Sequence, residues 1–302
     1  MQKIKIRLPA TLTDFSPGLR SLGLAISLYT HVEMIPRDDD QLIVETEGKG
    51  AGYYALGLRH PVVLGMIRVF QRLERTLLGI TVRVQNTIPL NSGLGAEDAF
   101  MVAGIVGASN LLGGVLSRDT LIDMVAQNSP RPDAAIASIL GGLTAVARLT
   151  DGVIYRSLPL ESFKIILAIP KQANYQQPPL PKGVSIGAAL YDTQRIPIVL
   201  EALREGNLAL LAQVLDDKLI AEAIQERISG YAHVVEMARL AGAFAVTTSG
   251  GGPAMIFLAE NQHDDIAEVI ETAFANIDTP ATVHVLPLDT QGIVISMMQT
   301  QA

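Results

Sequence analysis

The sequence predicts an α+β fold built in two parts, and three observations support this. Segments of alternating apolar and polar residues, the pattern of half-buried strands, open the chain and recur near its end. A stretch in the middle carries apolar residues at helical spacing. Strand patterns cluster instead of alternating regularly with helices, which favours α+β over a doubly wound parallel sheet.

The first part is predicted to be rich in strands and then helical. Residues 1–7 alternate like a strand, and so do Thr81–Gln85. Met101, Ile105, Ala108 and Leu112 then share one helical face. A strand over Leu143–Arg148 and a turn at 150–152 follow. We therefore place a boundary near residue 155, with one domain over 1–155 and a second over 156–302.

The second part opens with a buried strand and returns to strands after a helical region. Ile165–Pro170 is a short apolar run, and helical patterns extend to about Ala241. The later strands, with a helix over 264–275 among them, are predicted at 245–247, 255–258, 282–285 and 292–295. The Pro- and Gln-rich segment 171–182 is either a lid or a solvated connector, and the sequence leaves both open.

Composition narrows the class of protein. With 302 residues and 49% hydrophobic content, the chain can fill two substantial cores. Its net charge of −7 argues against non-specific nucleic-acid binding, and its apolar runs are too short to span a membrane. No signal-peptide core is visible, so we expect a cytoplasmic protein. The chain has no cysteine, and its five histidines show no metal-ligand spacing.

A glycine-bearing loop between a predicted strand and a predicted helix is the strongest functional signal. It runs from Pro89 to Asp98 and includes Gly93 and Gly95. Glycine permits backbone angles that other residues avoid, and the first amides of a helix lack internal partners. Such a terminus attracts phosphate, although glycines in this position often serve turn geometry alone.

Three separated segments resemble the sequence motifs of the GHMP small-molecule kinases, and in particular of homoserine kinases. They are residues 8–25, residues 89–99 and residues 248–253, and a further homoserine kinase signature lies at 131–143. The resemblance implies a ribosomal-protein-S5-like N-terminal domain, a ferredoxin-like C-terminal domain, ATP and Mg²⁺ as cofactors, and a small alcohol as substrate. Dimers are frequent among such proteins, so a homodimer is compatible with it. The residues that it assigns to the nucleotide are Pro89, Asn91, Ser92, Gly93, Leu94, Gly95, Ala96, Ser249, Gly250, Gly251 and Gly252.

The expected magnesium ligands depart from the family pattern. Ala96 and Glu97 stand where the family has two serines, and Ser129 aligns with a family glutamate. One hypothesis is an exchange in which Glu97 supplies the carboxylate and Ser129 the hydroxyl of a magnesium site. The alternative is that Glu97 and Asp98 are ordinary acids of a first helical turn. A carboxylate about 5 Å from a phosphate charge is repelled by roughly 3 kcal/mol at an effective dielectric of about 20, so a working site would depend strongly on magnesium.

The expected acceptor site also departs from the pattern. Arg20 stands where homoserine kinases have an aspartate that meets the substrate ammonium, and Asp14 replaces an asparagine. The family arginines for the homoserine carboxylate fall near Gln177 and Ile224, which cannot pair with an anion as a guanidinium does. We therefore expect an acceptor other than homoserine, bearing a carboxylate or phosphate near Arg20. A surface ion pair for Arg20 is the alternative.

Asp133 is the candidate to receive the acceptor's hydroxyl proton. Phosphoryl transfer needs positioning and sometimes a carboxylate base. The Pro132-Asp133-Ala134 context equally suits a helix N-cap.

Two functions of different class follow. One is an ATP-dependent kinase of a small, anionic alcohol, with Asp133 and Glu97 as catalytic residues. The other is a protein of the same fold that has lost phosphoryl transfer and serves as a binding or regulatory protein, or as an enzyme for another reaction on an anionic ligand.

Overall fold

A computed structural model describes residues 2–54, 57–76 and 79–299. The larger of its two sheets contains strands from both the beginning and the end of the chain. The strands are hydrogen-bonded in the order β11-β1-β2-β4-β3, and β5 pairs with β2 and with β6. Only the β3–β4 pair is parallel among these. The bounds are β1 Gln2–Thr13, β2 Leu22–Pro36, β3 Leu42–Gly48, β4 Ile80–Asn86, β5 Leu143–Leu149, β6 Gly152–Leu158 and β11 Val294–Gln299.

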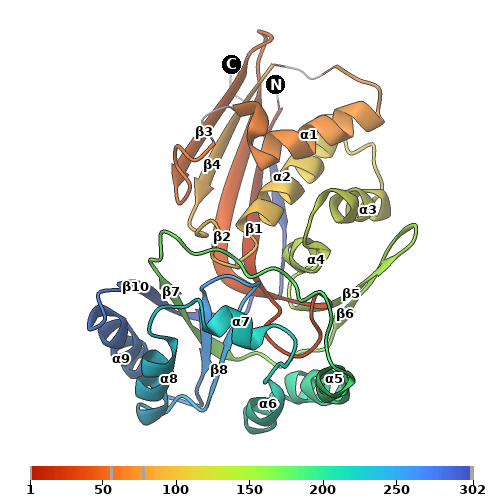
Figure 1. Cartoon of the computed structure of the whole chain (residues 1–302). Coiled ribbons are helices and arrows are strands. Elements are labelled where there is room, and N and C mark those ends of the chain that lie inside the picture. The colour runs from red at the N-terminus through yellow and green to blue at the C-terminus, as the bar shows by residue number, and fades with distance from the viewer. Residues whose placement is uncertain (1, 55–56, 77–78, 300–302) are drawn as a thin grey trace.

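Four helices cover one face of this sheet, as Figure 1 shows. They are α1 Pro61–Arg72, α2 Ala96–Leu111, α3 Arg118–Asn128 and α4 Pro132–Leu140, and the short 3₁₀ helix η1 Gly57–Arg59 precedes them. α2 is buried on nearly all sides, because it lies between α1 and β1. Among the described residues, no helix combines the length and the apolar character that crossing a membrane requires.

The second sheet is smaller and antiparallel, in the order β10-β7-β9-β8. Its strands are β7 Lys164–Pro170, β8 Ala245–Thr248, β9 Met255–Leu258 and β10 Ala281–Pro287. The remaining helices are α5 Ile186–Glu205, α6 Leu208–Val214, α7 Ala221–Gln225, α8 Tyr231–Leu240 and α9 His263–Ala275. Two of them, α8 and α9, lie side by side next to this sheet in Figure 1.

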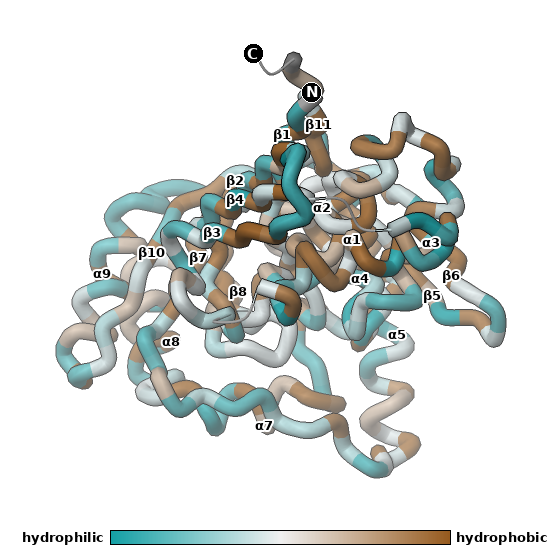
Figure 2. Tube along the Cα trace, turned by 90° about the horizontal axis from the view of Figure 1, so that it is seen from above, coloured by the Kyte–Doolittle hydropathy of each residue, from teal (hydrophilic) through white to brown (hydrophobic). Residues whose placement is uncertain are grey.

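Three hydrophobic clusters hold the layers together. One lies between the larger sheet and its helices, and one between the smaller sheet and α8 and α9. The third joins the two sheets, because Leu12 and Leu24 of the larger sheet pack with Leu167 and Ile256 of the smaller one. Hydrophobic residues accordingly gather toward the centre of the molecule in Figure 2, while outer turns are mostly hydrophilic.

The structure confirms the predicted α+β class. The strands predicted at Thr81–Gln85 and Leu143–Arg148 are β4 and β5, and the helix predicted over 264–275 is α9. β2 was not predicted, because residues 22–26 are buried on both sides and therefore show no alternation. The proposed boundary at residue 155 falls inside β6, and β11 returns from the second half of the chain to pair with β1.

His60 begins α1 and links stability to pH. Its Nδ1 accepts a hydrogen bond from the Val62 amide at 3.2 Å, and the residue is fully buried. Burial lowers the pKa of His60 from 6.5 to about 4. The unfolded chain therefore binds a proton at a pH where the folded protein does not.

We expect acidification from about pH 7 to about pH 5 to lower the free energy of unfolding by about 2 kcal/mol through His60 alone. The contribution of His60 to the free energy of unfolding is fully present above its unfolded-state pKa of 6.5, and it is lost as the pH falls toward its folded-state pKa of about 4. His60→Asn keeps a capping oxygen but cannot titrate, so its pH dependence should be shallower by that amount. Urea unfolding of both proteins at the two pH values measures the difference, and equal slopes would contradict the assignment.

Candidate functional site

A cavity of about 520 Å³ lies where the two glycine loops meet. Residues 89 and 91–98 line it together with residues 250 and 252 of the second loop. Thr13, Arg20, Pro130, Arg131, Ala134 and residues 175–177 complete the lining. The structure thus brings Arg20 and Glu97 to one cavity with the glycine loops. Of the other predicted residues, Asp14, Ser129 and Asp133 are buried beside the cavity, and Ser249 and Gly251 lie in the second loop without lining it.

The first glycine loop bends sharply before α2. Asn91, Gly93 and Gly95 have φ values of 55°, 84° and 70°, in the left-handed region that favours glycine. Gly95 is the N-cap of α2, and the Leu94 carbonyl accepts from the Thr11 amide at 3.1 Å. These contacts tie the loop to β1 and aim the start of α2 at the cavity.

The amides at the start of α2 remain available for a ligand. Among the described residues, no hydrogen bond engages the backbone N–H groups of residues 93–98. Residues 93–98 all line the cavity. Free amides at the positive end of a helix favour an anion, above all a phosphate.

The second glycine loop packs directly on the first. Ser249 Oγ donates to the Gly93 carbonyl at 2.7 Å, and the Gly250 amide donates to the Thr13 carbonyl at 2.6 Å. A Cβ atom at Gly93 would overlap the Ser249 carbonyl, and one at Gly252 would overlap the backbone of Ser92 and Gly93. The glycines therefore serve loop packing as well as access for a ligand.

The two acids of the first turn of α2 have different partners. Glu97 Oε1 accepts a short hydrogen bond from the Tyr54 hydroxyl, whereas Asp98 Oδ1 accepts one from Ser129 Oγ. Burial raises the pKa of Asp98 to about 7, and the charges of Asp133 and Glu97 act in the same direction. Ser129, which we paired with Glu97 from the sequence, thus contacts Asp98. Within the described residues, no three His, Cys, Asp or Glu side chains form a metal-binding group.

Arg131 is the centre of the buried charges beside the cavity. Its Nη2 lies 2.8 Å from Asp14 Oδ2 and 2.8 Å from Asp133 Oδ2, and it donates to Thr13 Oγ1 at 2.5 Å. Nε donates to Asp133 Oδ1 at 3.2 Å, and Nη1 donates to the Gly250 carbonyl at 3.2 Å. Burial acts to lower the pKa of Arg131, but the hydrogen bond to Asp133 and the neighbouring carboxylate charges together raise it. Arg131 therefore connects the end of β1, the start of α4 and the second glycine loop.

Asp133 neither caps α4 nor lines the cavity. The N-cap is Arg131, and no side-chain hydrogen bond caps this helix, so the capping alternative is wrong. Asp133 instead lies fully buried behind the Arg131 guanidinium.

Arg20 presents a cation with spare donors to the cavity. Its amide donates to Asp14 Oδ1 at 2.8 Å, and its Nη1 donates to the Pro130 carbonyl at 3.3 Å. The pKa of Arg20 is lowered by burial first and by Arg131 second. Both Asp14 and Arg20 have positive φ, a conformation that concentrates at functional sites.

The segment 171–182 crosses the second glycine loop. Tyr175 OH donates to the Gly251 carbonyl at 2.6 Å, and Gln177 Nε2 donates to the Gly250 carbonyl at 3.2 Å. Residues 175–177 line the cavity, so the segment forms one of its walls. Ile224, in contrast, is buried in the cluster behind the smaller sheet.

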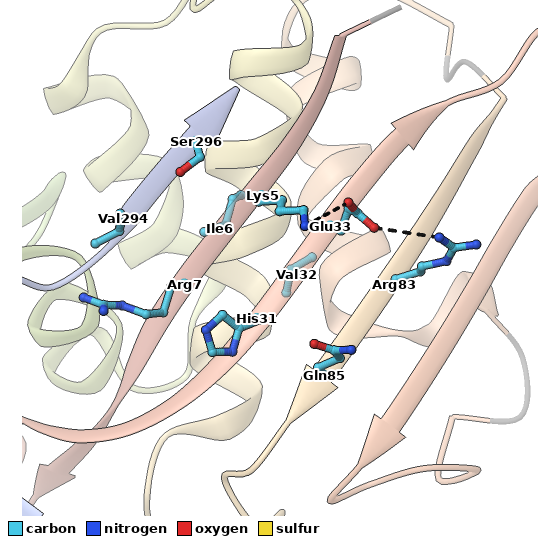
Figure 3. A pocket seen from close by; sticks show the side chains of 10 residues that line it. All are labelled: Lys5, Ile6, Arg7, His31, Val32, Glu33, Arg83, Gln85, Val294 and Ser296. Atoms are coloured by element: carbon cyan, nitrogen blue, oxygen red, sulfur yellow. Dashed lines mark ion pairs between the residues drawn. The ribbon is translucent and has the colours of Figure 1, made fainter. Parts of the chain in front are cut away.

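A second hollow, of about 310 Å³, lies on the outer face of the larger sheet (Figure 3). Glu33 lines it and pairs with Lys3 at 3.0 Å, Lys5 at 3.6 Å and Arg83 at 3.8 Å. Most of its charges are thus already paired across neighbouring strands, and both glycine loops lie outside its lining.

Sequence reasoning missed Arg131, Asp98 and Tyr175 as members of this site. Arg131 carried one usable signal, since it stands two residues before a candidate Asp at the start of a helix. Asp98 follows Glu97 directly, and only the fold shows which of the two faces Ser129.

Comparison with known proteins defines the class. Residues 62–142 match the GHMP kinases N terminal domain. A homoserine kinase of Moorella thermoacetica is 31% identical over 294 residues, which cover 96% of this chain and 99% of that protein. The chain therefore belongs to the GHMP kinases.

Further relatives that match nearly the whole chain include other homoserine kinases. A second one, of Carboxydothermus hydrogenoformans, is 29% identical and is matched over 92% of both chains. The crystal structure of homoserine kinase from Cytophaga hutchinsonii superposes with a TM-score of 0.85 at 23% identity over 97% of both chains. That of a putative homoserine kinase from Listeria monocytogenes has a TM-score of 0.77 at 22% identity and covers 97% of this chain and 99% of the other. These structures confirm the two-domain GHMP kinase fold, and the relatives support an ATP-dependent phosphotransferase.

Proposed function

We propose that this protein transfers the γ-phosphate of ATP to the hydroxyl of a small, anionic alcohol. The observation that carries the proposal is the row of unengaged amides at residues 93–98, which faces a cavity closed by the second glycine loop. This arrangement suits the phosphates of a nucleotide. Phosphoryl transfer depends mainly on positioning and on stabilising charge, which amides and cations around one cavity supply.

The oxygen atoms at the start of α2 suit a magnesium ion. Glu97 and Asp98 both line the cavity, and the hydrogen bond from Ser129 Oγ to Asp98 Oδ1 places a hydroxyl in direct contact with a carboxylate there. Mg²⁺ prefers such hard oxygen ligands together with substrate phosphates. When bound there, it would neutralise the phosphate charge that the two acids otherwise repel. We keep Glu97 and Ser129 as proposed ligands and add Asp98.

The charge pattern supports an acceptor other than homoserine. Arg20 offers unpaired donors to the cavity, whereas Asp14 and Asp133 are already held by Arg131. A carboxylate or phosphate group on the acceptor would pair with Arg20. Asp133, our proposed proton acceptor, can reach a hydroxyl only if the Arg131 side chain moves.

The position of Arg131 over Asp133 favours the second candidate function. Because Arg131 covers Asp133, a protein that binds an anionic ligand without transferring phosphate is compatible with the same geometry. The two candidates share the ligand site and differ in turnover.

Calorimetric titration of ATP with excess magnesium and with chelator tests the proposal. We expect magnesium to tighten ATP binding by at least on the order of 100-fold, because it removes roughly 3 kcal/mol of carboxylate–phosphate repulsion. ATP turnover should then be screened with small alcohols, including L-homoserine. Binding without turnover would select the second candidate, and no binding in either condition would reject the nucleotide site.

A further inference from the structure

We propose that Arg131 determines the charge class of the acceptor, because its guanidinium occupies the place at which an acceptor ammonium group would meet Asp14 and Asp133. The inference rests on the proposed function, since it concerns the part of the same cavity that Arg20 and Arg131 line. We call this part the acceptor half of the cavity.

The two carboxylates form a ready cation site. Asp14 directly follows β1 and Asp133 lies in the first turn of α4, yet both lie 2.8 Å from the single Nη2 atom of Arg131. Their side chains are 1% and 0% exposed, and that of Arg131 is 12% exposed. A buried carboxylate needs a cation or hydrogen-bond donors, and here the protein supplies its own cation.

The position of Arg131 is open to a ligand from the cavity side. Arg131 itself lines the cavity, whereas Asp14 and Asp133 lie behind it. A shorter, neutral side chain at 131 would therefore extend the cavity down to both carboxylates. A primary ammonium group is a compact cation with three donors. It can take the place of the Nη2 group of Arg131 between the two carboxylates.

With Arg131 in place, the acceptor half of the cavity selects against an ammonium group. The cation left with spare donors is Arg20, whose Nη1 donates to the Pro130 carbonyl at 3.3 Å. An ammonium on the acceptor would lie between two guanidinium groups and find both buried carboxylates engaged. An acceptor with an anionic group and no amine is not repelled by the two guanidinium groups and does not need the two carboxylates.

Two probes that differ by one ammonium group test this inference: L-homoserine and 4-hydroxybutanoate. Their affinities for the wild type, Arg131→Gln and Arg131→Lys are measured by calorimetry without nucleotide. We expect Arg131→Gln to bind L-homoserine at least about tenfold more tightly than the wild type does, with no such gain for 4-hydroxybutanoate. Arg131→Lys keeps a cation at the same place and should show no gain.

Three outcomes would overturn the inference. The first is that Arg131→Gln binds L-homoserine no more tightly than the wild type does. The second is that Arg131→Gln gains affinity for both probes equally, which would mean that Arg131 only fills space. The third is that Arg131→Lys gains as much affinity for L-homoserine as Arg131→Gln does. If Arg131→Gln does not fold, the double variant with Asp133→Asn carries the same test, because it removes one buried charge and leaves Asp14 for the ammonium. The readout needs neither ATP nor turnover, so a failed kinase proposal and a failed role of Arg131 remain distinguishable.

Discussion

Replacing Gly252 by alanine is expected to lower the free energy of unfolding by about 3 kcal/mol and to weaken ATP binding by at least about tenfold. The added Cβ atom would overlap the Ser92 carbonyl group and the Gly93 amide nitrogen. All of these are backbone atoms, so no side chain can turn away to make room. The two glycine loops would have to separate, and the amides of residues 93–98 would lose their alignment with the cavity.

Urea unfolding and ATP titration of the same preparation measure both effects. Gly183→Ala is a matched control, because an added Cβ there meets no atom within 4 Å and its φ lies outside the positive region. It should leave ATP binding unchanged and alter stability by less than about 1 kcal/mol. A Gly252→Ala protein as stable as this control would contradict the tight packing of the loops.

Changing Asp98 to asparagine is expected to remove most of the magnesium dependence of ATP binding. Asparagine retains an oxygen that can accept from Ser129 Oγ but loses the charge. Loss of a carboxylate about 5 Å from a divalent cation removes roughly 7 kcal/mol of attraction at an effective dielectric of about 20, so ATP affinity in magnesium should fall by at least about 100-fold. ATP affinity in chelator should rise, because one repulsive charge is gone.

Comparison with Glu97→Gln and Asp38→Asn isolates this effect. Glu97 is held by Tyr54 rather than by Ser129, so its substitution should have the smaller effect of the two. Asp38 is an exposed acid of the β2–β3 turn, and its substitution should leave ATP titrations unchanged. If Asp98→Asn responds to magnesium as the wild type does, Asp98 is not a ligand.

The sequence predicted those elements of the fold in which local pattern and burial agree. β4 alternates between the core and the outer face, and its strand was correctly predicted. The first half of β2 is buried on both sides, so its residues Leu22–Ile26 are all apolar or glycine and show no strand period. Only tertiary packing distinguishes such a run from a buried helix.

The site was predicted as a set of segments and not as a set of contacts. The glycine loops and Arg20 meet at one cavity as expected. The contact between Ser129 and Asp98 was not predicted, because adjacent positions on a helix point about 100° apart and the sequence does not show which of Glu97 and Asp98 faces Ser129. The Arg131–Asp14 ion pair joins residues more than a hundred positions apart, and no local pattern encodes it.

The pairing of β11 with β1 has a consequence for biosynthesis. The edge of the larger sheet beside β1 stays open until residues 294–299 have left the ribosome, although β1 itself is made first. An open edge is a template for pairing with another chain, and non-local strand pairing is slow. The nascent N-terminal half is therefore expected to need protection until residues 294–299 have been made, and a fragment that ends near residue 155 should associate with itself instead of remaining monomeric.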